Sequence, residues 1–236
     1  MLFGWFYYDW TVLILLPGML FAFWAQMKVS STFDRYSKKV SRTGRTGAEA
    51  ASQLLRANGV YDVRVERVRG DLTDHYDPRT RTLRLSESVH DSRSIAAIGV
   101  ACHEAGHALQ HAEKYSFLQL RMSIIPVCRI GSGLAMPLFL VGLLIGELGY
   151  VFMVAGILCF SLAALFQLIT LPVEFNASNR AMRILEDSGM LGGTELRGAS
   201  KVLRAAALTY VAALFSSVLQ LLRLFLLVQR GERRRR

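Results

Sequence analysis

The fold of this chain is decided by residues 94–115, SIAAIGVACHEAGHALQHAEKY. This stretch contains the pattern HExxH at His103, Glu104 and His107. On an α-helix, side chains four residues apart lie on one face, about 5–6 Å apart at Cβ, so both imidazoles can reach one metal ion. The flanking residues are small or apolar, which favours a functional motif on a packed helix over a chance occurrence of the pattern on a polar surface.

The three residues of this pattern have separate roles in zinc hydrolysis. A catalytic zinc holds three protein ligands and a water, so His103 and His107 leave one ligand to be found elsewhere. Zinc lowers the pKa of its water from about 15.7 towards about 7, and a nearby carboxylate takes the proton as that water attacks a carbonyl. We therefore predict His103 and His107 as ligands and Glu104 as the general base.

The composition indicates a membrane protein with a polar part. Of its 236 residues, 52% are hydrophobic, and the mean hydropathy is +0.31. The apolar residues gather in blocks that approach the ~20 residues needed to cross a bilayer: 10–27, 123–145, 148–170 and 205–228. The first block lacks a basic segment before it and a cleavage site after it, and Trp5, Trp10 and Trp24 bracket it, so we expect an uncleaved signal-anchor.

The distribution of charge predicts the orientation. Six basic residues between positions 28 and 45 follow the first block, whereas Asp9 is the charged residue before it. The positive-inside rule then places the amino terminus outside and the next segment in the cytosol. Four crossings would leave the arginines at 233–236 outside, so either that position is tolerated or the fourth block, interrupted by Gln220 and Arg223, lies along the interface.

The net charge of +10 reflects this membrane topology, and it does not indicate a nucleic-acid surface. The basic residues cluster beside apolar blocks without interleaved aromatic residues, so we expect no nucleic-acid partner. Cys102, Cys128 and Cys159 show no paired or metal-ligand spacing. They fit a reducing compartment and a role in packing.

The segment between the first two blocks predicts a small α/β domain. We expect a helix capped by Thr46 and ending near Asn58, then a half-exposed strand over 61–68. A hairpin follows with its turn at Asp77-Pro78, and Ser94 caps the helix that carries the histidines. A strand directly before such a helix can offer a free edge to an extended peptide, although an ordinary structural hairpin fits the sequence equally well.

The third zinc ligand must lie on the same side of the membrane as His103. Two crossings return the chain to that side, where residues 171–189, LPVEFNASNRAMRILEDSG, follow. Glu174, expected at the start of a helix just beyond Pro172, is the favoured ligand. Glu147 falls in the turn on the far side, and three ligands along one straight helix cannot surround a tetrahedral ion. The competing candidates are Glu113, Glu147, Glu186, Asp187 and His111.

Three long motifs occur in order: TDHYDPRTRTLRLSESV at 73–89, SIAAIGVACHEAGHALQH at 94–111 and LPVEFNASNRA at 171–181. Together they resemble the neutral zinc metallopeptidases of bacterial membranes, the YugP-like family, and more distantly the HtpX-type and CAAX-prenyl membrane proteases. The resemblance covers nearly the whole chain. It implies that His103, His107 and Glu174 hold one Zn2+ per chain, with Glu104 as base, in the bacterial plasma (inner) membrane.

The sequence departs from the HtpX pattern at Ser178, where those relatives tend to have an aspartate four residues after the ligand glutamate. Asn176 or Ser178 could replace it as the hydrogen-bond partner of a histidine. Donors to the oxyanion are also needed, and the candidates by chemistry are His75, Tyr76, Asn179 and Arg180. A structural role is the simpler expectation for each of these four residues.

These inferences define the expected organisation. The fold is a mainly α polytopic membrane protein with a small α/β zincin-like (gluzincin) metalloprotease domain. Its parts are an N-terminal membrane helix (1–27), a cytosolic α/β part with the HExxH helix (28–122), a membrane hairpin (123–170), a helical segment with the third ligand (171–204), and a membrane or interfacial helix with a basic tail (205–236).

The expected function is a membrane-embedded zinc endopeptidase with a cytosolic active site that hydrolyses membrane or membrane-proximal proteins. Its partners are the lipid bilayer and protein or peptide substrates, and a membrane-protein partner is left open. The alternative is a non-catalytic membrane scaffold with a structural zinc. An ion transporter is disfavoured because the apolar blocks contain few strongly polar residues: Arg129, Gln167, Gln220 and Arg223.

Overall fold

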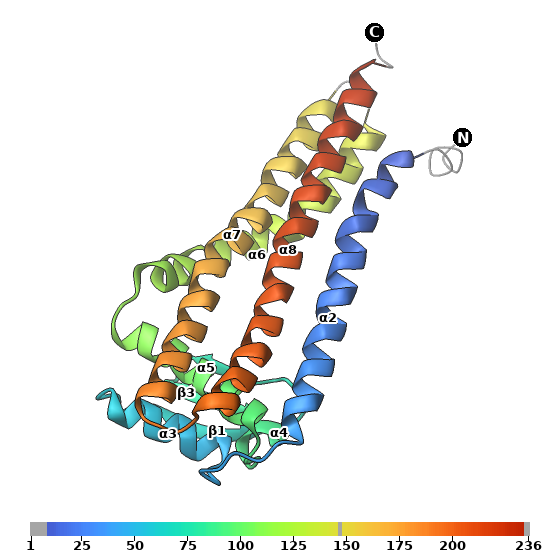
Figure 1. Ribbon diagram of the computed structural model, residues 1–236. Coiled ribbons are helices and arrows are strands. Elements are labelled where there is room, and N and C mark those ends of the chain that lie inside the picture. The colour runs from blue at the N-terminus through green and yellow to red at the C-terminus, as the bar shows by residue number, and fades with distance from the viewer. Residues whose placement is uncertain (1–8, 146–147, 234–236) are drawn as a thin grey trace. The chain divides into compact units, whose positions relative to one another are not determined.

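The computed structural model describes residues 9–145 and 148–233 (Figure 1). The expectations for Trp5, Glu147 and the arginines at 234–236 fall outside these residues. Four long helices dominate: α2 (Leu16–Ser37) after the 3-10 turn η1 (Trp10–Leu15), α6 (Ser116–Leu144), α7 (Gly149–Asp187) and α8 (Gly193–Arg233). Three shorter helices and three strands complete the described part: α3 (Gly47–Ala57), α4 (Glu87–His90), α5 (Ile95–Ala112), β1 (Arg64–Val68), β2 (His75–Asp77) and β3 (Thr82–Ser86). The mainly helical prediction is confirmed.

All four apolar blocks lie in helices long and apolar enough to cross a membrane, spanning Trp10–Ser37, Ser116–Leu144, Gly149–Asp187 and Gly193–Arg230. At the ends that border polar segments, these helices extend beyond the predicted apolar blocks. Polar residues there continue the same helical backbone hydrogen bonding. One expectation was wrong: Glu174 does not begin a helix. Pro172 lies inside the continuous helix α7, and Glu174 follows it without a break.

The chain divides into two compact units. The helix unit comprises Met1–Trp24, Leu120–Thr170 and Thr209–Arg236, and the sheet unit comprises Ala25–Gln119 and Leu171–Leu208. Helices α2, α6, α7 and α8 contribute residues to both units. The candidate metal ligands all belong to the sheet unit.

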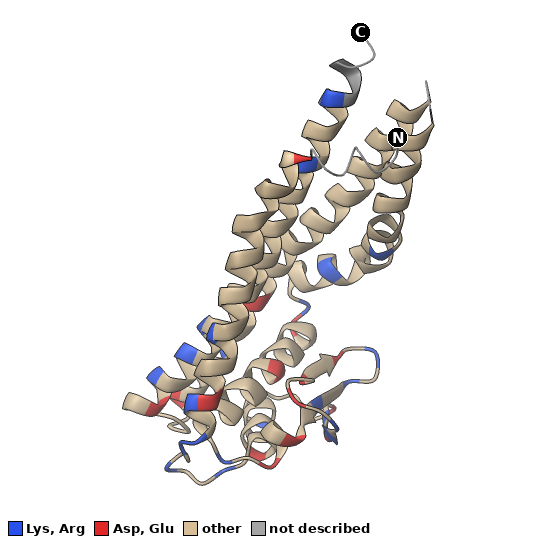
Figure 2. Ribbon diagram, turned by 90° about the vertical axis from the view of Figure 1, so that its right-hand side faces the viewer, with Lys and Arg blue, Asp and Glu red and all other residues tan. Residues whose placement is uncertain are grey.

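Within the helix unit, small residues allow close approach. A Cβ on Gly156 of α7 would lie 2.8 Å from the Ala135 carbonyl oxygen of α6, so glycine is required there. A Cβ on Gly18 of α2 would lie 3.0 Å from the Ser216 hydroxyl of α8. Many other apolar side chains are exposed, and Figure 2 shows how few charges the long helices carry over much of their length. Such surfaces suit a lipid environment.

The sheet unit has a continuous hydrophobic core. Helix α3 begins at the Thr46 cap that the sequence predicts, and the structure adds a complete capping box with Glu49; the helix buries Leu54 and Leu55. Those leucines join the same core as Leu83 and Leu85 of β3 and the small residues of α5. This core fixes α5 firmly in the unit.

The three strands form a mixed sheet with the order β1-β3-β2. Strand β3 pairs in parallel with β1 and antiparallel with β2. Strand β1 is shorter than the predicted 61–68 but half-exposed as expected. The strand before the HExxH region, β3, is central and has no free edge, so that expectation was wrong. Instead β2, the first strand of the hairpin, lies at an edge.

Candidate metal centre

Helix α5 presents the two histidines on one face. Ser94 caps its first turn, and the Ser94 Oγ accepts a hydrogen bond from the Ala97 N–H at 3.1 Å. The rings of His103 and His107 lie 4.8 Å apart between centroids, nearly perpendicular at 83°. Their side chains are 14% and 12% exposed, so the pair is largely withdrawn from solvent.

Glu174 of α7 completes the cluster. Its Oε2 lies 3.3 Å from His103 Nε2 and 3.5 Å from His107 Nε2, and the side chain is 3% exposed. The three candidate ligand atoms all lie within 4.8 Å of one another. Ligand atoms about 2.0–2.2 Å from a tetrahedral zinc would be about 3.3–3.6 Å apart. The two distances to Glu174 match this spacing, and two imidazole nitrogens with one carboxylate oxygen suit the chemistry of zinc.

The close approach of α5 and α7 depends on Gly106. A Cβ at this position would lie 2.7 Å from the Ala177 carbonyl oxygen, which is closer than side-chain carbons approach backbone oxygens. Gly106 lies between the two histidines, and Ala177 lies one turn beyond Glu174 on α7. The absent side chain thus lets the ligands of one helix meet the ligand of the other.

The outward nitrogens of both histidines have hydrogen-bond partners. Ser178 Oγ lies 3.0 Å from His103 Nδ1, as one of the two sequence-based alternatives anticipates. His107 Nδ1 contacts Gln110 Oε1 at 3.0 Å. The sequence analysis missed Gln110, although a glutamine three residues after a histidine on a helix can meet it on the same face. Asn176 contacts Gln110 at 2.9 Å rather than either histidine.

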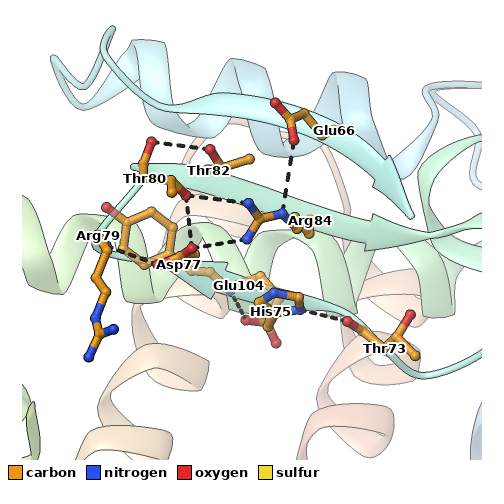
Figure 3. Close-up of polar contacts among 10 residues, drawn as sticks. Glu66, Thr73, His75, Asp77, Arg79, Thr80, Thr82, Arg84 and Glu104 are labelled. Carbon is orange, nitrogen blue, oxygen red and sulfur yellow. Dashed lines mark hydrogen bonds and ion pairs between the residues drawn. The ribbon is translucent and has the colours of Figure 1, made fainter. Parts of the chain in front are cut away.

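Glu104 lies beside the edge strand β2 (Figure 3). Its Oε2 accepts a hydrogen bond from the Tyr76 N–H at 3.2 Å. Burial raises the pKa of Glu104; the Glu174 and Asp74 charges act in the same direction, while the neighbouring histidines oppose them. A carboxyl group with a raised pKa is a better proton acceptor than an ordinary surface glutamate.

The β2–β3 hairpin, whose strand β2 contains Tyr76, is held in place by Asp77. The Asp77 carboxylate accepts hydrogen bonds from Arg84 Nη1 at 3.0 Å, Thr80 Oγ1 at 2.9 Å and the Arg79 N–H at 2.9 Å (Figure 3). These contacts, the Arg84 bond foremost, lower the pKa of Asp77 to about 2. The aspartate therefore stays charged and keeps the hairpin fixed over a wide pH range.

The competing ligand candidates lie in other contacts. His111 Nδ1 and the Tyr76 hydroxyl form a hydrogen bond at 2.9 Å, and burial raises the pKa of that phenol to about 12. Glu113 forms an ion pair with Arg180 at 2.7 Å. Glu186 and Asp187 are exposed at the end of α7, as expected of a helix terminus.

The oxyanion candidates make structural contacts. Arg180 pairs with Glu113, and its Nε also donates to Asn176. His75 Nδ1 contacts the Thr73 carbonyl, and Asn179 is exposed. The three cysteines are free thiols, and Cys102 is fully buried in the core of the sheet unit.

Comparison with known proteins agrees with this geometry. The family model described as "Putative neutral zinc metallopeptidase" matches residues 11–229. The "Putative membrane protease YugP" of Bacillus subtilis (strain 168) is 53% identical over 220 residues, covering 93% of this chain and 97% of that protein. No solved structure matches the chain. The chain therefore belongs to the neutral zinc metallopeptidase family and is a membrane protein with four candidate spans.

Proposed function

We propose that the protein is a zinc endopeptidase of the HExxH-plus-Glu (gluzincin) type, with one zinc ion per chain held by His103, His107 and Glu174. The observation that carries this proposal is the meeting of two imidazoles from α5 and a buried carboxylate from α7 at zinc-ligand spacing. In the described residues this cluster offers three donors. A closed structural zinc site uses four, so three favour catalysis over the scaffold alternative.

Glu104 acts as the proton carrier. When bound, zinc would polarise the peptide carbonyl and lower the pKa of the attacking water, so that the water loses its proton more easily. Glu104 accepts a proton from the attacking water and then donates it to the nitrogen of the leaving amine as the C–N bond breaks. The hydrogen bond from the Tyr76 N–H orients the carboxylate for both transfers.

Strand β2 is the proposed binding edge for an extended substrate. Among the described strands it pairs with β3 alone, and its Tyr76 N–H is directed at Glu104 rather than into the β3 ladder. A peptide added at this edge would run beside the catalytic glutamate and gain main-chain hydrogen bonds with little demand on sequence. The substrate class is therefore an unfolded or extended protein segment.

We propose that these segments come from membrane or membrane-proximal proteins. Glu174 follows the predicted end of the third apolar block, Thr170, by four residues of one continuous helix, which is a rise of about 6 Å. A site so close along the chain to an apolar span favours substrates that are delivered at the bilayer surface. The six basic residues at positions 28–45 support a cytosolic active site.

Contacts within the helix unit support a crossing rather than an interfacial fourth helix. Arg223 of α8 forms an ion pair with Asp9 at 2.7 Å, and Phe215 contacts Phe21 of α2 edge-on at 6.0 Å between centroids. Pairing neutralises the charge that would otherwise disfavour this span. Both termini would then lie on the outer face, and protection of residues beyond 230 from external protease in right-side-out vesicles would contradict this.

The test of catalysis is Glu104→Gln in the purified full-length protein. The amide cannot accept the proton, so cleavage of an unfolded casein substrate should fall by about 10²–10⁴-fold while zinc stays bound. Glu186→Gln, on an exposed glutamate near the end of α7, is the matched control and should keep near-wild-type activity. Undiminished cleavage by zinc-loaded Glu104→Gln would overturn the proposed role.

A further inference from the structure

The side chain of Gln110 is fully buried and makes three polar contacts, one within α5 and two with α7. Its Oε1 lies 3.0 Å from His107 Nδ1. Its Nε2 donates to the Val173 carbonyl oxygen at 2.9 Å and to Asn176 Oδ1 at 2.9 Å. Both protons and the oxygen of the amide therefore have partners in the interior of the sheet unit.

The chemistry of these partners fixes the orientation of the amide. A backbone carbonyl can only accept, so the nitrogen end of the Gln110 amide must face Val173. The oxygen end then faces His107, and an amide oxygen can only accept. His107 Nδ1 must therefore carry the hydrogen, which leaves the lone pair of neutral His107 on Nε2, the atom beside Glu174.

Asn176 strengthens this orientation. Its Oδ1 accepts from Gln110 and also from Arg180 Nε at 2.7 Å, so the Asn176 oxygen is fixed by two donors. Arg180 in turn pairs with Glu113 at the end of α5. His103 differs, because its partner Ser178 is a hydroxyl that can either donate or accept and so does not dictate a tautomer.

We propose that Gln110 is a positioning residue that sets the tautomer of His107 and couples it to the backbone next to Glu174. Val173 directly precedes Glu174, so one amide holds both the ring of a ligand on α5 and the main chain beside a ligand on α7. This inference rests on the proposed function, since it concerns how ligands are presented to zinc. Loss of such an outer hydrogen bond typically lowers metal affinity by about 10–100-fold.

The test measures zinc affinity of the full-length protein by chelator competition. Gln110→Leu removes all three contacts and should weaken zinc binding by about 10–100-fold. Gln53→Leu makes the same chemical change on α3, where the buried Gln53 Oε1 has no hydrogen-bond partner among the described residues, and should leave zinc affinity close to wild type. Circular dichroism and thermal unfolding check that each variant is folded.

A second readout reports the tautomer itself. The reporter is zinc-free Glu174→Leu protein labelled with 15N-histidine, which lacks the carboxylate beside His107 Nε2. At a pH where the rings are neutral, His107 should carry its hydrogen on Nδ1 in this protein, and adding Gln110→Leu should give a mixture of tautomers. Adding Gln110→Glu instead keeps an acceptor for the Nδ1 hydrogen and should retain the Nδ1 signal, so it also decides the matter if the Gln110→Leu variant does not fold.

The outcomes separate this inference from the proposed function. A wild type that binds no zinc would overturn the proposed function itself. A wild type that binds zinc, with Gln110→Leu indistinguishable from Gln53→Leu, would overturn the role of Gln110 alone. An Nε2-protonated neutral His107 in zinc-free Glu174→Leu protein would do the same.

Discussion

The helix unit and the sheet unit treat polar groups in opposite ways. The sheet unit buries Glu174 and Gln110 and arranges partners around them from two helices. The helix unit leaves apolar side chains such as Leu20 and Val151 exposed, at 68% and 62%, and pairs Arg223 with Asp9. A polar group in the interior needs a specific partner, whereas an apolar surface needs only lipid.

This contrast shows where chemistry can be placed in such a chain. The helix unit tolerates many apolar exchanges, because lipid-facing positions need only hydrophobicity. The sheet unit depends on individual atoms, because each buried donor must meet an acceptor. Substitutions in the sheet unit should therefore disturb function. Substitutions in the helix unit should disturb stability alone.

The largest effect is expected from Glu174→Gln. Loss of the carboxylate removes a proposed ligand, so zinc affinity should fall by more than the about 10–100-fold typical of an outer partner. Chelator competition measures the loss, and activity should fall with it. Glu186 is an exposed glutamate on the same helix and was a competing ligand candidate, so the Glu186→Gln variant should bind zinc normally. Weaker zinc binding by this variant would indicate that Glu186 is a ligand.

The next effect concerns the helix unit. Arg223→Leu leaves Asp9 without its ion-pair partner, which should lower the free energy of unfolding by about 3 kcal/mol. Thermal unfolding in detergent measures the change. Zinc affinity of the folded variant should not change, and the double variant Asp9→Asn with Arg223→Leu should recover part of the stability. A parallel loss of zinc binding would break the separation between the units.

Gly106→Ala should disturb the sheet unit by steric overlap. The added methyl would meet the Ala177 carbonyl, so α5 must shift away from α7, at a cost of about 1–3 kcal/mol in stability and with weaker zinc binding. Gly99→Ala is the control on the same helix, where the new Cβ would lie 3.3 Å from the Ala199 side chain. Equal zinc affinities for the two variants would contradict the role of close approach at Gly106.

The smallest effect is a pH dependence. Burial alone would lower the pKa of His107, but its hydrogen bond with Glu174 and the Glu104 charge outweigh burial and raise it. In zinc-free protein, the resulting stabilisation is present below about pH 6.5, the unfolded value, and is lost as pH rises through the higher folded pKa. Zinc competes with that proton, so zinc affinity should rise over the same interval.

Titrations of unfolding and of zinc binding at several pH values check this prediction. His107→Gln should remove both trends attributed to this ring. A zinc-free wild type whose stability increases through that interval, with His107→Gln following the same curve, would show that another group controls the dependence.

Local sequence signals predicted much of the structure correctly. The Ser94 cap, the Thr46 cap of α3 and the four apolar helices follow from residues close together in the chain. Spacing on one helix also identified which face His103 and His107 share. The place of Glu174 within α7 was mispredicted, because Pro172 is a strong local signal for a helix boundary that the continuous backbone of this helix overrides.

The sequence by itself determined that His103 and His107 share one face, because helical spacing places them one turn apart, and topology with the family resemblance favoured Glu174 as their partner. Only the tertiary structure decided the rest: that Gly106 lets α7 approach, that β2 rather than β3 lies at the edge, and that Gln110 of α5 donates to the Val173 carbonyl of α7. These are contacts between residues far apart in the chain, and local propensity does not encode which buried donor meets which acceptor.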